Sequence, residues 1–267
     1  MMRRVLGSFA LLLIAGCRIH RAYQQDRPPV IMIFADVTVK DDEPQAVKRA
    51  IYDIVDRAPE NSTFLMYPVE ANMDYVDTFS RESIAFRHDN GVAAIKADGE
   101  KRKELANRAI ASLETIAKTI PSNLPESCLA RTLQRAARDI ARVENRPVDV
   151  VLITDMVEEC NNSIGGGRVM LNHVHIESDI AAAKKEAGTF ADLHGAAVYF
   201  IYPPGKKSGV NVEQHRADSN ELQAFWSAIL SHSNLKGSPQ FLAGTSVYHE
   251  NWKSTAQRVT DATPDEQ

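Results

Sequence analysis

Two uninterrupted apolar runs, each ending in an aspartate, dominate the pattern of the chain. The first, VIMIFADVTVK, covers residues 30–40 and contains Asp36, and the second, VDVVLITDMVEE, covers residues 148–159 and contains Asp155. Runs of large or β-branched residues without polar alternation are typical of strands that a parallel sheet buries on both faces. Because sites in such sheets lie outside the carboxyl ends of the strands, we expect Asp36 and Asp155 to face each other across one crevice if the strands are neighbours.

Helical periodicity alternates with further apolar runs along the rest of the chain. The spacing predicts helices that begin at Pro44, at an Asp98 cap (to about residue 120) and at Pro125, and two more at residues 179–193, capped by Gly195, and 219–230. Strands are expected at residues 62–69 and 196–204, with candidate edge strands at 75–79 and 84–87 in a region that gives no clear pattern. Strands alternating with helices predict an α/β fold: a three-layer, doubly wound, mostly parallel sheet with helices on both faces.

The first seventeen residues, MMRRVLGSFALLLIAGC, have the pattern of an export signal. Two arginines precede an apolar run at residues 5–14, which is too short to span a bilayer comfortably, and small residues precede Cys17. The ending resembles the bacterial lipoprotein signal, which implies that Cys17 is lipidated after cleavage; the alternative is a plain secretory signal. Arg18 follows the cysteine, and the resemblance then implies a location in the cell envelope, on the outer membrane facing the periplasm.

Composition and charge limit the rest of the chain. The 267 residues are 44% apolar and 25% charged, which is ordinary for a globular protein. We expect a signal peptide at 1–16, a lipidated tether at 17–28, one folded domain at 29–250 and a polar tail at 251–267. Removing residues 1–16 takes away two of the 31 basic residues, so the formal charge becomes 29 minus 35, or −6. No basic stripe typical of a nucleic-acid binder is evident, so we expect no nucleic-acid partner.

Two cysteines remain after the lipidated one, and in an exported protein an even remainder is a candidate disulfide. Cys128 lies in the first turn of a predicted helix after Ser122, and Cys160 lies five residues beyond Asp155. In the predicted fold both lie above adjacent strands at the carboxyl edge of the sheet. We therefore predict that Cys128 and Cys160 are bonded; the alternative is a pair of buried free thiols.

A strand ending in DVTVK, a mid-chain helix within SNLPESCLARTLQRAARDI and a strand ending in LITDM together resemble the von Willebrand factor A domain. The likeness covers residues 29–235. This family's metal-ion-dependent adhesion site has the pattern D-x-S/T-x-S, then a loop Thr or Ser, then an Asp. By position, the resemblance implies that Asp36, Thr38, Ser122 and Asp155 are metal ligands. It also implies that the protein binds a protein partner at the carboxyl edge.

Lys40 departs from this pattern, because the family has a hydroxyl where this chain has an ammonium. Carboxylate and hydroxyl oxygens suit Mg²⁺, but a protonated lysine cannot ligate a cation. Lys40 therefore either takes the metal position as a fixed positive charge or points outward and leaves a weaker site. Lys40, Glu158 and Glu159 are the expected rim for partner binding, and the alternative for the two glutamates is a solvated charge cluster. The alternative for Asp36 and Asp155 is that they only cap neighbouring loops.

The leading function is therefore a membrane-anchored protein-interaction module in the cell envelope, for which no catalysis is needed. One alternative is a magnesium-dependent phosphatase similar to the haloacid dehalogenase superfamily, with Asp36 as nucleophile, Ser122, and Asp155 with Glu159 holding the metal. That family generally needs a second acid two residues after the nucleophile, where this chain has Thr38. The other alternative is a small-molecule binding protein, since doubly wound folds carry many ligands.

Overall fold

The computed structural model of the protein describes residues 28–36, 43–69, 80–84, 91–119, 127–143, 145–156, 158, 177, 180–181, 184–185, 190–202, 212–245 and 248. In chain order the elements are β1 (Val30–Asp36), α2 (Glu43–Arg57), β2 (Thr63–Val69), β3 (Ser80–Ser83), α3 (Val92–Thr119), α4 (Leu129–Ile140), β4 (Val148–Ile153), β5 (Ala197–Ile201), α6 (Val212–Ile229) and β6 (Gln240–Leu242).

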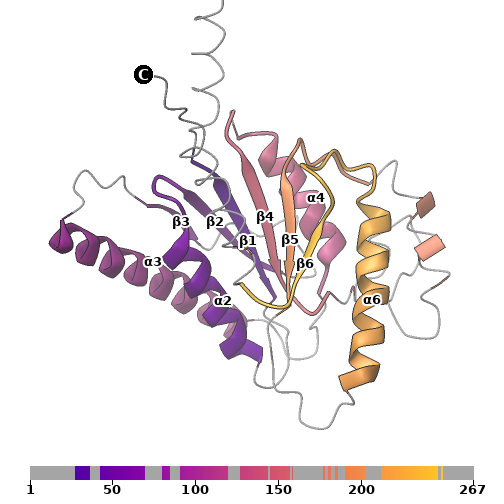
Figure 1. Ribbon diagram of the computed structural model, residues 1–267, viewed down its shortest axis with the longest axis horizontal. Helices are drawn as coiled ribbons and strands as arrows, with labels where there is room; N and C mark the ends of the chain where they lie inside the picture. Colours follow the sequence, from indigo (N-terminus) through magenta and orange to yellow (C-terminus); the bar gives the residue numbers. More distant parts are fainter. Residues whose placement is uncertain are drawn as a thin grey trace, which may run out of the picture.

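The strands form one sheet in the order β3-β2-β1-β4-β5-β6, with β1 and β4 at its centre (Figure 1). All neighbouring strands are parallel except β2 and β3, which pair antiparallel. The register of the central pair places Ala35 opposite Ile153, so both strands end at the same level. The predicted α/β fold with a mostly parallel sheet is therefore confirmed, and the two acidic strands are neighbours.

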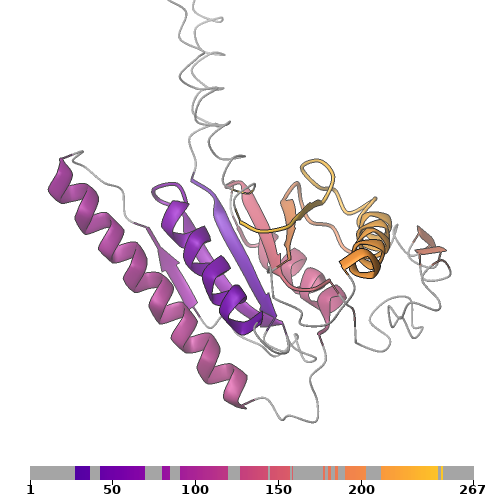
Figure 2. The same cartoon turned by 60° about the horizontal axis from the view of Figure 1, so that its bottom comes forward.

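Helices cover both faces of this sheet because alternate residues of each strand point to opposite sides. In β1, Val30, Met32 and Phe34 pack with α4 and α6, whereas Ile31 and Ile33 pack with α2 and α3. Figure 2 shows α2 and α3 running side by side over one face of the sheet. The runs without polar alternation thus bury both rows of side chains, which explains their composition. Among the described residues, no helix has the length and apolarity needed to cross a membrane.

Helix α3 begins at Val92, six residues before the predicted Asp98 cap, so that cap assignment is wrong. Asp98 instead accepts a hydrogen bond from Arg102 Nε at 2.7 Å. The Arg102 guanidinium also donates to the main-chain oxygens of Val55 and Ala58, at 3.3 and 2.6 Å. Arg102 therefore binds carbonyl groups at the C-terminal end of α2 that the helix itself leaves unsatisfied. Asp98 orients the arginine that joins α3 to α2.

Four other sequence expectations need correction. Residues 190–193, predicted to end a helix, are not helical, and the turn that follows has positive φ at His194 (51°) and Gly195 (79°). Helix α6 begins at Val212 rather than residue 219, and α4 begins at Leu129 after an N-cap at Cys128. The edge strands β3 and β6 lie outside the expected ranges, because short strands of three or four residues have too little pattern to show in the sequence. All of the strand predicted at 75–79, and residues 85–87 of the strand predicted at 84–87, lie outside the described residues.

Arg146 holds the segment that leads into β1, the first strand of the sheet. Its guanidinium donates to the main-chain oxygens of Pro28, Pro29 and Asn61 and to Thr63 Oγ1, at 2.9 to 3.2 Å. Partial burial lowers the pKa of Arg146 from its ordinary value. These bonds join the start of β1 to the start of β2 at the amino edge of the sheet. The carboxyl edge, with Asp36, therefore lies at the opposite end of the strands.

Candidate functional site

Asp36 is the last residue of β1 and lies between α4 and the end of β4. Its Oδ2 atom accepts a hydrogen bond from Ser127 Oγ at 2.9 Å and another from Thr154 Oγ1 at 3.1 Å. The side chains are almost fully buried, with exposed fractions of 2% for Asp36, 3% for Ser127 and 0% for Thr154. Burial without such partners would strongly disfavour a charged carboxylate. The two hydroxyls therefore hold Asp36 in place at the carboxyl edge.

Hydrogen bonds in the turn after β4 hold the residues on both sides of Asp155. Thr154 Oγ1 accepts a hydrogen bond from the Met156 amide at 3.1 Å, and the Met156 carbonyl accepts one from Trp226 Nε1 at 3.0 Å. Met156 has a φ of 68°, a left-handed conformation that costs free energy in a residue other than glycine. Asp155 lies between these two fixed residues and is partly exposed. Asp36 ends β1 and Asp155 follows β4, its neighbour in the sheet, and the described hydrogen bonds to Asp36 come from Ser127 and Thr154.

Glu158 lies beneath the edge rather than on its rim. Its side chain is fully buried, and its Oε2 atom accepts a hydrogen bond from the Ala130 amide, in the first turn of α4, at 2.7 Å. A carboxylate at the N-terminus of a helix satisfies a free N–H group and interacts favourably with the helix dipole. The expectation that Glu158 takes part in a partner-binding rim is therefore wrong, because its carboxylate is used inside the protein.

The remaining predicted site residues lie outside the described part of the chain: Cys17, Thr38, Lys40, Ser122, Glu159 and Cys160. The sequence pattern does not single out Ser127 and Thr154. Ser127 lies two residues before α4, and Thr154 directly precedes the predicted acid. Hydroxyl residues next to a helix start or a strand end are common, so neither one differs from an ordinary loop residue until the fold brings it to Asp36.

The oxygens at this edge have the donor chemistry that a hard cation prefers. Asp36 and Asp155 supply carboxylates, and Ser127 and Thr154 supply hydroxyls. However, Asp36 Oδ2 already accepts hydrogen bonds from both hydroxyls. A cation bound at Oδ2 would replace one of these hydrogen bonds, and that hydroxyl would have to rotate so that its oxygen faces the cation. Across the described positions, no group of three or more His, Cys, Asp or Glu side chains is arranged to hold a metal. These residues thus fit Mg²⁺ in type, and a site would need hydroxyl or main-chain oxygens as well.

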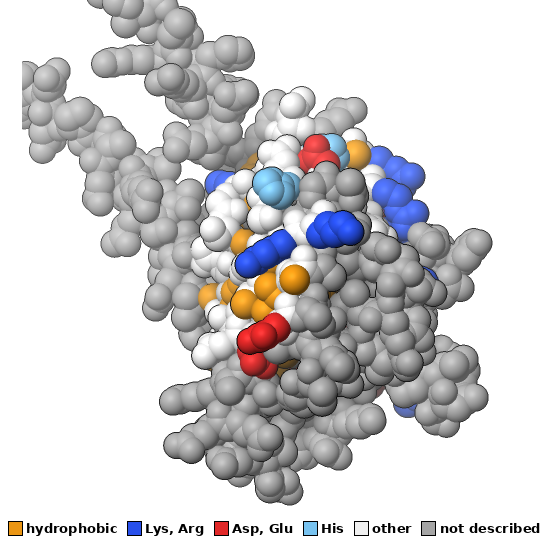
Figure 3. Space-filling model, turned by 90° about the vertical axis from the view of Figure 1, so that its right-hand side faces the viewer, with side chains coloured by type: hydrophobic (Ala, Val, Ile, Leu, Met, Phe, Trp, Pro, Cys, Tyr) orange, Lys and Arg blue, Asp and Glu red, His pale blue; other side chains and the backbone are white. Residues whose placement is uncertain are grey.

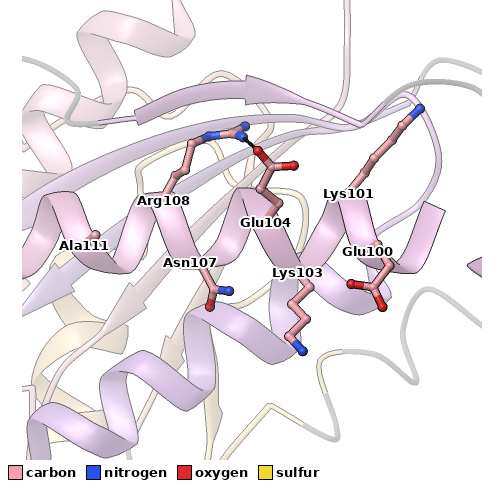
Figure 4. A pocket seen from close by; sticks show the side chains of 7 residues that line it. All are labelled: Glu100, Lys101, Lys103, Glu104, Asn107, Arg108 and Ala111. Atoms are coloured by element: carbon pink, nitrogen blue, oxygen red, sulfur yellow. Dashed lines mark hydrogen bonds and ion pairs between the residues drawn. The ribbon is translucent and has the colours of Figure 1, made fainter. Parts of the chain in front are cut away.

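A hollow of 570 Å³ lies elsewhere, on the solvent side of α3 (Figure 4). Its lining comes from one helix: Glu100, Lys101, Lys103, Glu104, Asn107, Arg108 and Ala111. Arg108 and Glu104 form an ion pair across it at 2.8 Å. Small-molecule sites are typically enclosed and mostly apolar. This hollow is open to solvent, its lining comes from one helix and Asp36 does not belong to it, so it gives no support to a small-molecule site at the carboxyl edge.

Comparison with known proteins gives no family assignment. No family model matches the sequence, and no curated protein matches it. Similar solved structures include a von Willebrand factor type A protein from Catenulispora acidiphila, with 13% identity, a TM-score of 0.40 and coverage of 86% of this chain and 42% of that one. The PilB minor pilin from Streptococcus sanguinis has 12% identity, a TM-score of 0.42 and coverage of 90% and 64%.

A third similar structure is the pilus adhesin SpaC from Lactobacillus rhamnosus GG in its open conformation, with 10% identity and a TM-score of 0.35. The match covers 88% of this chain and 30% of the adhesin. This chain therefore spans less than two thirds of each of the three proteins. At these identities and scores the function has to be argued from the site itself.

Proposed function

We propose that the protein is a protein-interaction module of von Willebrand factor A type that binds a partner at the carboxyl edge of its sheet. The observation that carries the proposal is the arrangement at the ends of β1 and β4, where a buried Asp36 is held by two hydroxyls beside a partly exposed Asp155. Preorganised polar groups of this kind bind with little loss of conformational freedom. In this proposal Asp155 contacts the partner and Asp36 supports the edge.

The same geometry makes the phosphatase alternative less favourable. A nucleophilic Asp36 would have to reach a phosphate, yet its side chain is 2% exposed and its Oδ2 atom already accepts two hydrogen bonds. An acid two residues later would be needed for proton transfer, and that position is Thr38. Binding without turnover requires neither feature, so it agrees better with the described residues.

We also propose that a lipid on Cys17 anchors the protein to the outer membrane on its periplasmic side. The support is the sequence of residues 1–18, together with the entry of the chain at the amino edge, where Arg146 holds Pro28 and Pro29. The interaction edge would then point away from the anchor. Mass spectrometry of the mature amino terminus tests the anchor, and an unmodified terminus at a residue other than Cys17 would contradict it.

The partner-binding edge is tested by replacing Asp155 with alanine. We expect the recovery of the partner from envelope extract to fall about tenfold, because a charge-assisted contact at an interface contributes on the order of 1.4 kcal/mol or more. The matched control is Asp192→Ala, which removes an exposed aspartate at the amino edge of β5. The measurement is quantitative mass spectrometry of proteins captured by each variant. Equal recovery of every protein by wild type and Asp155→Ala would refute the proposed edge.

A divalent cation at Asp36, Thr38, Ser122 and Asp155 remains a proposal, supported by the oxygen donors at this edge. Adding Mg²⁺ should raise the melting temperature of the wild type more than that of Asp36→Ala, since a ligand that binds only the folded state stabilises it. If Lys40 takes the metal position, this difference disappears and Lys40→Ser restores it. Equal melting temperatures with and without Mg²⁺ in both the wild type and Lys40→Ser would remove the metal from the proposal.

The pairing of Cys128 with Cys160 is likewise proposed. Cys128 is fully buried next to Ser127, and Cys160 lies outside the described residues. The closed loop would hold 33 residues counting both ends, for which the chain-entropy model gives about 3 to 4 kcal/mol. Thiol titration of unreduced, denatured protein from an oxidising compartment should find no reactive thiol at these positions before reduction and two after it. Two thiols before reduction would exclude the bond.

A further inference from the structure

The outward side of α4 carries a row of arginines. Leu129, Leu133 and Ile140 belong to the buried core and mark the inward side of the helix. At 3.6 residues per turn, the arginines fall within an arc of about 60° on the opposite side and extend over about 16 Å. This row, which we name the arginine face, consists of Arg131, Arg135 and Arg138 in α4 and Arg142 in the turn that follows it.

Positive charge is concentrated on this helix although the chain is acidic. Residues 129–142 contain four arginines and one acid, Asp139, which gives a local charge of 4 minus 1, or +3, in a chain of formal charge −4. Arg138 and Arg142 lie at exposed positions, and a surface with charge of one sign favours a partner of the opposite sign.

Asp139 holds part of the arginine face in a fixed arrangement. Its carboxylate accepts hydrogen bonds from Arg135 Nε at 2.9 Å and from Arg142 Nη1 at 3.2 Å. The Arg135 guanidinium also lies 5.6 Å from the centre of the Tyr67 ring, and its side chain is only 15% exposed. The Arg142 side chain is 78% exposed, so most of its five N–H donors remain accessible. Asp139 thus orients the guanidinium groups of Arg135 and Arg142 before any partner arrives.

We propose that the arginine face binds an acidic polypeptide segment of the partner. The forked donors of arginine match carboxylates in a bidentate manner. Glutamates at every third or fourth position of a helix are about 5–6 Å apart, which equals the spacing of the arginines. Helix α4 begins beside Ser127, so one partner can contact the Asp36 edge and the arginine face together. The side of the molecule that carries α6 instead mixes basic, acidic and hydrophobic side chains (Figure 3).

This inference rests on the proposed function, since it names the chemistry of the same partner. The test uses the full chain and a fluorescent helical peptide with glutamates at every third or fourth position, with fluorescence anisotropy as the readout. The variant combines Arg138→Gln and Arg142→Gln, both at exposed positions. The control combines Arg49→Gln and Lys101→Gln, which remove two exposed charges from the opposite face of the sheet. Equal melting temperatures establish that all forms are folded.

We expect the wild type to bind the glutamate peptide about tenfold more tightly than a peptide with glutamine at the same positions. The variant with Arg138→Gln and Arg142→Gln should bind the glutamate peptide about tenfold less tightly than the wild type. The control should bind it like the wild type. Equal losses in both variants would overturn the inference, because attraction would then be nonspecific. Displacement of the peptide at lower concentration by phosphatidylglycerol vesicles or single-stranded DNA would also overturn it, in favour of another class of ligand.

The two proposals fail separately. If the arginine variant binds the peptide like the wild type while Asp155→Ala loses its envelope partner, the arginine face is rejected and the proposed function stands. If Asp155→Ala keeps every envelope partner while the arginine variant loses the peptide, the interaction edge is rejected and the acidic specificity of α4 stands.

Discussion

Replacing Asp139 with alanine should lower the free energy of unfolding by about 3 to 4 kcal/mol. Asp139 is 8% exposed and accepts hydrogen bonds from Tyr67 Oη at 2.8 Å and from two arginines. Alanine would leave the Tyr67 hydroxyl and the largely buried Arg135 guanidinium without this acceptor. The exposed Arg142 contributes little, because solvent screens its charge. Urea unfolding followed by intrinsic fluorescence measures the loss.

Two controls separate the contributions at Asp139. Asp139→Asn keeps one oxygen acceptor, so its free energy of unfolding should fall by about half as much as that of Asp139→Ala. Arg142→Ala should change the free energy of unfolding by less than about 0.5 kcal/mol. An Asp139→Ala protein within about 1 kcal/mol of the wild type would show that the cluster does not stabilise the fold. The variant should also weaken binding of the glutamate peptide, because Arg135 and Arg142 lose the group that orients them.

The same cluster contributes to the loss of stability in alkaline solution. Burial first, and then the hydrogen bond to Asp139, raise the pKa of Tyr67 well above its ordinary value of 10.0. Above pH 10 the unfolded chain releases this proton while the folded protein keeps it. The stabilising contribution is therefore complete below pH 10 and is lost as the pH rises further. Tyr67→Phe removes this group, so the fall in stability between pH 9 and pH 11 should be shallower than in the wild type.

Replacing Tyr248 with alanine should lower the free energy of unfolding by about 4 kcal/mol, the cost typical of a lost buried aromatic ring. Tyr248 is fully buried, packs edge-to-face on Tyr199 with ring centroids 4.7 Å apart, and donates a hydrogen bond to Asp149 Oδ2 at 3.1 Å. Nearby, Thr245 Oγ1 donates to Asp53 Oδ2 at 3.0 Å. This C-terminal segment therefore belongs to the core beneath α2.

The matched change Tyr248→Phe keeps the ring and removes only the hydroxyl, so it should cost about 1 kcal/mol. Chemical denaturation of both variants, monitored by circular dichroism, distinguishes the ring from the hydrogen bond. A loss below about 1.5 kcal/mol for Tyr248→Ala would show that the segment packs only weakly. The expected domain range of 29–250 remains a prediction, and a large loss would place its C-terminal limit beyond Tyr248.

The sequence alone determined the central strands, because β1 and β4 are buried on both faces and therefore consist of unbroken apolar runs. It also placed acids at the ends of these strands, since Asp36 and Asp155 directly follow the runs. The alternation of strands and helices was enough to predict a doubly wound α/β sheet. These features depend on neighbours in the chain and on burial, which periodicity reports directly.

Only the tertiary structure decided the partners of these acids. Ser127 contacts Asp36 from 91 positions away and Thr154 from 118 positions away, distances along the chain at which local pattern carries no signal. The start of α3 was missed because Asp98 resembles a cap in sequence, while in space it orients Arg102 against the end of α2. Glu158 was expected on the surface because glutamates usually are. It is buried because α4 presents a free amide to it, and such a cross-element hydrogen bond exists only after the elements have packed together.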